Sequence, residues 1–179
     1  SYTEYSPDEL LDLLEVAGRY ADPALLEECL RRPDELTPDL LTMLREPAPS
    51  EDWLGEDPRW FRRVHAGKLL LAFGEQEALP RFLDLMRDPE KQTLVEWFDT
   101  DLHVFGPPAV PAFVELMRDP SAPAFGRHYA ISTLQQIAQD HPEEVRERVL
   151  EVLRGELPPV SSEGELQLAR DASPEEVSY

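Results

Sequence analysis

The chain has 179 residues and a formal net charge of −20, because 37 acidic side chains outweigh 17 basic ones. A surface this acidic repels phosphate backbones, and no uncharged apolar run reaches the ~18 residues of a membrane span, so we expect neither nucleic-acid nor membrane partners. The polar, acidic start does not have the pattern of a secretory signal, and the single cysteine, Cys29, rules out an internal disulfide, so a cytoplasmic protein is expected.

The first third of the chain predicts three helices. Ser6 and Glu9 have the spacing of a capping box at the start of a helix over residues 7–18. A second helix is expected over residues 23–32. The third is expected to start at Thr37-Pro38 and to run to about residue 45, because proline suits the first turn of a helix.

The middle of the chain contains a repeat. Residues 78–89, ALPRFLDLMRDP, return as residues 109–120, AVPAFVELMRDP. Apolar side chains at i, i+3, i+4 and i+7 in each copy predict an amphipathic helix. A Phe-Gly pair before each copy suits the left-handed residue that closes a preceding helix. A repeat at this kind of spacing indicates stacked supersecondary units.

Six further helices and two irregular segments complete the prediction. The helices are expected at about 57–73, 78–87, 90–104, 108–118, 124–139 and 142–154. The run 46–52 is expected to be a loop, with Trp53 docking it. The polar, acidic segment 156–179 is expected to be a mobile tail. The sequence therefore predicts an all-α protein of about nine helices without a sheet.

Residues 61–80, FRRVHAGKLLLAFGEQEALP, resemble the HEAT repeat in the bacterial version first noted in phycobilisome-lyase-type proteins. Residues 130–150 resemble the closing repeat of bacterial HEAT-like proteins, and residues 35–41 resemble their N-terminal part. The resemblance covers roughly residues 7–155. It implies a short right-handed α–α superhelix, a fold that acts as a scaffold with many uses.

The resemblance also implies a domain organisation. N-terminal helices over residues 7–46 would precede repeat units at about 57–89, 90–120 and 121–155. Together these would form one domain, residues 1–155, followed by the tail 156–179.

No residue pattern indicates catalysis, a cofactor or a metal. No two of the histidines lie within five residues of each other, so converging metal ligands are not predicted. HEAT-like deoxyhypusine hydroxylases use His-Glu pairs, and no such dipeptide occurs here. We interpret the histidines as structural or solvated and Cys29, on an apolar stripe, as a buried thiol. The histidines are His65, His103, His128 and His141.

An enzymatic alternative stays open. Alkylpurine DNA glycosylases of this solenoid class hold DNA with aromatic and basic residues around an aspartate, and Trp97-Phe98-Asp99 is the only local candidate. The basic residues with which such enzymes hold DNA have no counterpart in this acidic chain, so Trp60 and Trp97 are interpreted as core or rim residues. Some relatives in fold carry phycobilin lyase activity, but no residues here indicate a bilin site. The alternative is thus a lyase-like or glycosylase-like enzyme or accessory factor without a recognisable site.

The favoured hypothesis is a non-enzymatic protein–protein interaction scaffold. Asp84 and Glu115 hold the same slot on successive second helices, which line the concave face of HEAT stacks. The sixth predicted helix adds Glu96, Asp99 and Asp101. An acidic concave face of this kind would attract a basic peptide or protein. The other interpretation of these carboxylates is a solvated face that binds nothing.

Overall fold

The computed structural model of the protein describes residues 1–47 and 57–156. Within these residues the chain forms nine α-helices and five short 3-10 helices and no strand, so the predicted all-α class is confirmed there. Most of the predicted loop 46–52, the docking of Trp53, and the predicted tail beyond residue 156 lie outside the described residues.

The N-terminal helices are α1 (Pro7–Val16), α2 (Pro23–Leu30) and α3 (Pro33–Arg45), and each begins with proline. The predicted capping box is present at α1. The Ser6 hydroxyl accepts from the Glu9 N–H at 3.3 Å, and the Glu9 carboxylate accepts from the Ser6 N–H at 2.7 Å. Two backbone donors that the helix cannot satisfy are thereby paired.

The predicted start of the third helix at Thr37 is wrong, because α3 begins at Pro33 and carries Pro38 inside it. Pro33 suits the first helical position, and the acidic Asp34 and Glu35 in the first turn favour the positive end of the helix dipole. Pro38 has no N–H, so α3 lacks one backbone hydrogen bond at this position.

Apart from the sixth, the predicted middle and C-terminal helices are present, although the start of the predicted helix 57–73 forms the 3-10 helix η1 (Pro58–Phe61). The two repeat copies lie on α5 and α7, and each of these helices is preceded by a 3-10 turn. Gly74 closes α4 with a φ of 68°, the left-handed conformation expected there. The helices are α4 (Arg62–Phe73), α5 (Leu79–Arg87), α7 (Val110–Arg118), α8 (Ala124–Asp140) and α9 (Pro142–Glu156).

The predicted sixth helix over residues 90–104 is wrong. Only α6 (Gln92–Glu96) is α-helical, with turns and the 3-10 helix η4 (Leu102–Phe105) after it. The physical reason is packing. Phe98 is fully buried, with its ring edge-to-face on Phe82 at 5.1 Å and lying where a Cβ on Gly67 would be. The polar residues 99–101 that follow favour turns over helix.

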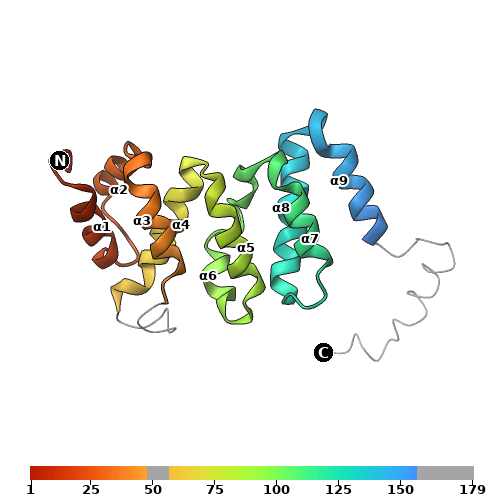
Figure 1. Ribbon diagram of the computed structural model, residues 1–179, viewed down its shortest axis with the longest axis horizontal. Coiled ribbons are helices and arrows are strands. Elements are labelled where there is room, and N and C mark those ends of the chain that lie inside the picture. Colours follow the sequence, from red (N-terminus) through yellow and green to blue (C-terminus); the bar gives the residue numbers. More distant parts are fainter. Residues whose placement is uncertain (48–56, 157–179) are drawn as a thin grey trace, which may run out of the picture.

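The chain advances along the long axis from α1–α4 through the pair α5 and α6 and the pair α7 and α8 to α9 (Figure 1). The most extensive contacts between helices join α3 to α4, α7 to α8, and α8 to α9. One continuous cluster of buried apolar side chains joins them. Phe82 and Phe113, which occupy the same position in the two repeat copies, are 1% and 0% exposed, as their register predicts.

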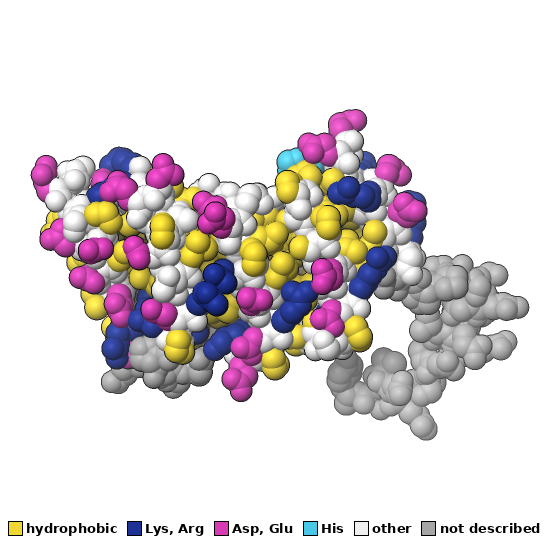
Figure 2. All heavy atoms as spheres, in the orientation of Figure 1, with side chains coloured by type: hydrophobic (Ala, Val, Ile, Leu, Met, Phe, Trp, Pro, Cys, Tyr) yellow, Lys and Arg dark blue, Asp and Glu magenta, His cyan; other side chains and the backbone are white. Residues whose placement is uncertain are grey.

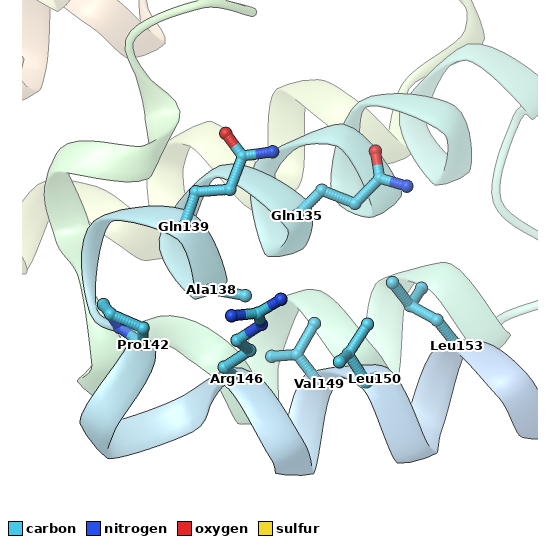
Figure 3. A pocket seen from close by; sticks show the side chains of 8 residues that line it. All are labelled: Gln135, Ala138, Gln139, Pro142, Arg146, Val149, Leu150 and Leu153. Atoms are coloured by element: carbon cyan, nitrogen blue, oxygen red, sulfur yellow. The ribbon is translucent and has the colours of Figure 1, made fainter.

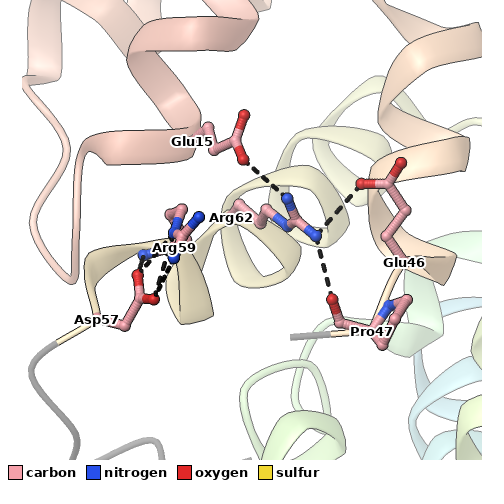
Figure 4. Close-up of polar contacts among 6 residues, drawn as sticks. All are labelled: Glu15, Glu46, Pro47, Asp57, Arg59 and Arg62. Atoms are coloured by element: carbon pink, nitrogen blue, oxygen red, sulfur yellow. Dashed lines mark hydrogen bonds and ion pairs between the residues drawn. The ribbon is translucent and has the colours of Figure 1, made fainter. Parts of the chain in front are cut away.

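Arg62, the first residue of α4, ties the N-terminal helices together (Figure 4). Its guanidinium pairs with Glu15 of α1 at 2.8 Å and with Glu46, just after α3, at 3.3 Å. It also donates to the Pro47 carbonyl oxygen at 3.1 Å. Because the Arg62 side chain is 14% exposed, this network is screened less by water than a surface pair.

The crossing of α8 over the end of α5 gives a stability prediction. A methyl group on Gly126 would overlap the carbonyl oxygen of Met86, and a backbone oxygen cannot rotate away. We expect Gly126→Ala to lower the free energy of unfolding by about 1–3 kcal/mol or more, measured by urea denaturation. Gly155→Ala in α9 is the matched control. It meets no heavy atom within 4 Å and should be neutral or stabilise by up to about 1 kcal/mol. Equal midpoints for the two variants would contradict the crossing.

Candidate functional site

Asp84 on α5 and Glu115 on α7 are both exposed. Neither receives a hydrogen bond or an ion pair from another described residue. Their carboxylates are therefore open to a partner, as the acidic-face hypothesis requires, and the hypothesis itself stays a prediction.

The other three predicted acids have different surroundings. Asp101 pairs with Lys68 of α4 at 2.6 Å, so its charge is neutralised within the fold. Glu96 accepts a hydrogen bond from Gln92 at 3.2 Å. Asp99 is half-buried and lines a cavity. On the face seen in Figure 2, acidic side chains alternate with Lys and Arg, with apolar atoms between them. Of the five acids, Asp101 is paired within the fold and Asp99 lines a cavity, while Asp84 and Glu115 are exposed on α5 and α7.

Asp99 belongs to a polar cavity of about 320 Å³. One wall is the irregular segment that follows α6, and the other is α8, which packs against η4. No Lys or Arg of the described chain lines this cavity. The polar cavity is lined by Asp99, Thr100, His103, His128, Tyr129, Ser132, Thr133 and Gln136.

Several polar atoms of the polar cavity are already paired. His103 Nδ1 contacts Asp140 Oδ2 at 2.8 Å, and Gln136 Nε2 donates to Asp140 Oδ1 at 2.8 Å. The Ser132 hydroxyl donates to the backbone carbonyl of His128 at 3.2 Å. The hydroxyl of Thr133 is buried and has no hydrogen-bond partner among the described residues.

The charges near the polar cavity act on Tyr129. Burial raises the pKa of the Tyr129 phenol above its ordinary value, and the negative charges of Glu96 and Asp99 raise it further. The field of these two carboxylates therefore reaches the α8 side of the cavity.

An apolar groove of about 800 Å³, larger than the polar cavity, lies between the turn before α2, α2 itself and α4. Sequence reasoning missed it. The apolar stripe of α2 predicts one buried face, but Leu25 and Cys29 are buried while Leu30 is 46% exposed. The apolar groove is lined by Arg19, Tyr20, Ala21, Asp22, Pro23, Leu26, Leu30, Val64, His65, Lys68, Leu69, Ala72 and Trp97.

The rim of the apolar groove combines aromatic and charged side chains. The Arg19 guanidinium lies 5.5 Å from the ring centroids of both Tyr20 and Trp97. Tyr20 itself is 82% exposed. Asp22 accepts from the Tyr2 hydroxyl at 2.7 Å, and that bond holds the pKa of Asp22 below its usual range. Arg19 has no ion pair with a described residue.

His65 fixes the turn that borders the apolar groove. Its Nε2–H donates to the Gly18 carbonyl oxygen at 2.7 Å, and because a carbonyl only accepts, the bond sets the tautomer. Burial lowers the pKa of His65 below 6.5. His65 is therefore a neutral structural residue. Within the described residues, no three His, Cys, Asp or Glu side chains gather as metal ligands.

Cys29 and two tryptophans lie as the sequence predicts. Burial raises the pKa of the Cys29 thiol to about 11, so the thiolate is scarce at neutral pH. Trp60 is 3% exposed, and its ring contacts Phe61 with centroids 5.1 Å apart. Trp97 is half-buried, with its ring 5.9 Å from Phe61 at the rim of the apolar groove.

A third hollow, of about 610 Å³, lies between α8 and α9 (Figure 3). Gln135 and Gln139 extend from α8 on one side. Val149, Leu150 and Leu153 form the α9 side. Nothing in the described residues indicates what would occupy it.

Comparison with protein-family models, with curated proteins and with solved structures gives no match. None of the described helices has both the length and the apolar composition that a membrane-spanning helix needs.

The buried, neutral His65 gives a pH prediction. Its pKa is lower in the folded chain than the unfolded value of about 6.5, so the unfolded state takes up the proton first. His65 thus leaves stability unaffected above pH ~6.5 and lowers it as pH falls from there towards the folded pKa. His65→Gln keeps an N–H donor but cannot titrate, so its urea midpoint should fall less between pH 7 and about pH 5 than that of the natural chain. His128→Gln, at an exposed position, should follow the natural curve, and parallel curves for all three proteins would contradict the assignment.

Proposed function

We propose that this protein is a non-enzymatic scaffold of HEAT-like repeats that binds a segment of another protein. Two features support the repeat architecture. The sequence repeat falls on α5 and α7 with Phe82 and Phe113 buried in register, and the chain advances along a single axis (Figure 1). In a stack of repeats, neighbouring units bury one another's apolar faces, and the remaining surface of each unit is open to a ligand.

The observation that carries the proposal is the apolar groove. Leu26 and Leu69 line the groove, and Tyr20 and Leu30 stay exposed at its edge. Burying these two side chains would stabilise the folded state, so their exposure is unfavourable in the free protein. Contiguous exposed apolar surface of this kind marks interaction sites, and Tyr, Trp and Arg are the residues enriched among binding hot spots. The groove fits the apolar side chains of a helix or an extended segment from a partner.

The enzymatic alternative has weaker support. His103 and His128 both line the polar cavity, which is the feature that could suggest catalysis. The Ser132 hydroxyl, however, bonds the backbone of His128, and no hydrogen bond joins a hydroxyl to a histidine ring among the described residues. A nucleophile paired with its base is the arrangement that hydrolytic chemistry needs.

The groove can be tested with Tyr20→Ala combined with Leu30→Ser. Both positions are exposed, so the double variant should change the free energy of unfolding by less than about 1 kcal/mol. With the natural chain as bait, a pull-down from the host followed by calorimetry on the recovered protein should give at least about tenfold weaker binding for the variant.

The matched control is Val16→Ser with Val104→Ser, at apolar positions that are 60% and 41% exposed and lie outside the groove. This control should bind like the natural chain. Equal affinity for the groove variant and the control would refute the groove as the site.

The acidic-face hypothesis is a second proposal, favoured by the exposure of Asp84 and Glu115 without internal partners. Its partner would be a basic peptide or protein. Asp84→Asn with Glu115→Gln should weaken binding of the recovered partner and flatten the salt dependence of its affinity, without lowering thermal stability.

Asp39→Asn with Glu147→Gln removes the same charge from exposed positions on α3 and α9 and serves as the control. If both double variants reduce affinity equally, the negative charge only provides general attraction, and the Asp84–Glu115 surface is not the site.

A further inference from the structure

The polar cavity between the segment after α6 and α8 carries uncompensated negative charge. Asp99 lines it, half-buried, and receives no hydrogen bond or ion pair from another described residue. Asp140 lies at its edge, held by His103 and Gln136. No cationic Lys or Arg of the described chain lines the cavity. A carboxylate partly withdrawn from water attracts a cation more strongly than one on the open surface.

Thr133 supplies a second, independent observation. It lines the cavity from α8, is 2% exposed, and its hydroxyl oxygen is buried without a hydrogen-bond partner among the described residues. Buried hydroxyls are normally paired, because an unpaired one loses its hydration without compensation. A threonine in a helix adopts two side-chain rotamers, so a change of rotamer would turn the Thr133 hydroxyl into the cavity, where a ligand N–H could satisfy it.

The aromatic side chains of the same wall suit a flat cation. Tyr129 and His128 both line the cavity, with ring centroids 5.7 Å apart. A guanidinium group stacks on aromatic faces and also donates two parallel hydrogen bonds to a carboxylate, whereas an ammonium group does neither as well.

We propose that the polar cavity binds the guanidinium group of an arginine from a basic protein segment. Asp99 would accept its paired hydrogen bonds, Thr133 would accept a further one, and the Tyr129 ring would cover one face. The volume of about 320 Å³ accommodates one such side chain and excludes a whole folded element. The polar cavity shares no lining residue with the apolar groove, so a variant of one site leaves the other intact and the two proposals are tested independently.

The test uses an eight-residue peptide of alternating Gly and Arg, with citrulline and Lys versions as controls, titrated calorimetrically into the full chain at low salt. Citrulline keeps the shape of arginine and removes its charge. We expect the citrulline peptide to bind at least tenfold more weakly than the arginine peptide, and the lysine peptide to bind severalfold more weakly.

Three variants locate the site. Asp99→Asn should weaken binding of the arginine peptide about tenfold, and Thr133→Val should weaken it severalfold. Asp39→Asn removes the same charge from the exposed surface of α3 and should change affinity less than twofold. Circular dichroism checks that each variant is folded.

A measurement on the natural chain makes the test independent of any variant. On titration with the arginine peptide, the ring proton signals of His128 and His103 should shift in the NMR spectrum, while those of His65, which lies in the apolar groove, should stay unchanged.

Equal effects of Asp99→Asn and Asp39→Asn, equal binding of the citrulline peptide, or shifts at His65 alone would each overturn the proposal. Equal binding of the lysine peptide would overturn the assignment to arginine.

Discussion

The packing of Phe98 on the bare backbone of Gly67 is the contact on which the rest of the structure depends. A side chain on Gly67 would occupy the same space as the ring, so α4 accepts Phe98 only because residue 67 has none. The ring is fully buried and meets Phe82 of α5 edge-to-face. Because the chain turns inward to make this contact, α6 ends at Glu96 and the polar residues that follow are left at the wall of the polar cavity.

The same helix, α4, serves both candidate sites. Gly67 receives Phe98, and its neighbour Lys68 pairs with Asp101 and so holds the segment after Phe98 against α4. Val64 and Leu69 face the apolar groove, where His65 anchors the bordering turn through Gly18. Changes that loosen α4 are therefore expected to affect the groove and the cavity together, although no residue lines both.

Charge in this protein is organised locally. With a Debye length of about 8 Å at physiological ionic strength, the net charge of −20 matters less for a bound segment than the groups within reach of it. Lys68 neutralises Asp101, while Arg62 holds Glu15 and Glu46. Asp84, Glu115 and Asp99 have no such partner among the described residues. The two surfaces proposed for a basic partner follow from that difference, whereas the apolar groove depends on exposed apolar side chains.

The sequence by itself determined the helical class and most helix positions, because apolar periodicity, capping residues and the closure of α4 at Gly74 are local signals. It also determined the register of Phe82 and Phe113 through the repeat. It missed the start of α3 and the end of α6, and it treated Leu30 as part of a buried stripe. Only the tertiary structure decided where α6 ends and that Leu30 is exposed. The packing of Phe98 on Gly67, and how much of the α2 surface other helices cover, depend on residues distant in the chain. For the same reason Asp99 and Thr133, which come from separate segments, meet in a cavity that no local pattern could predict.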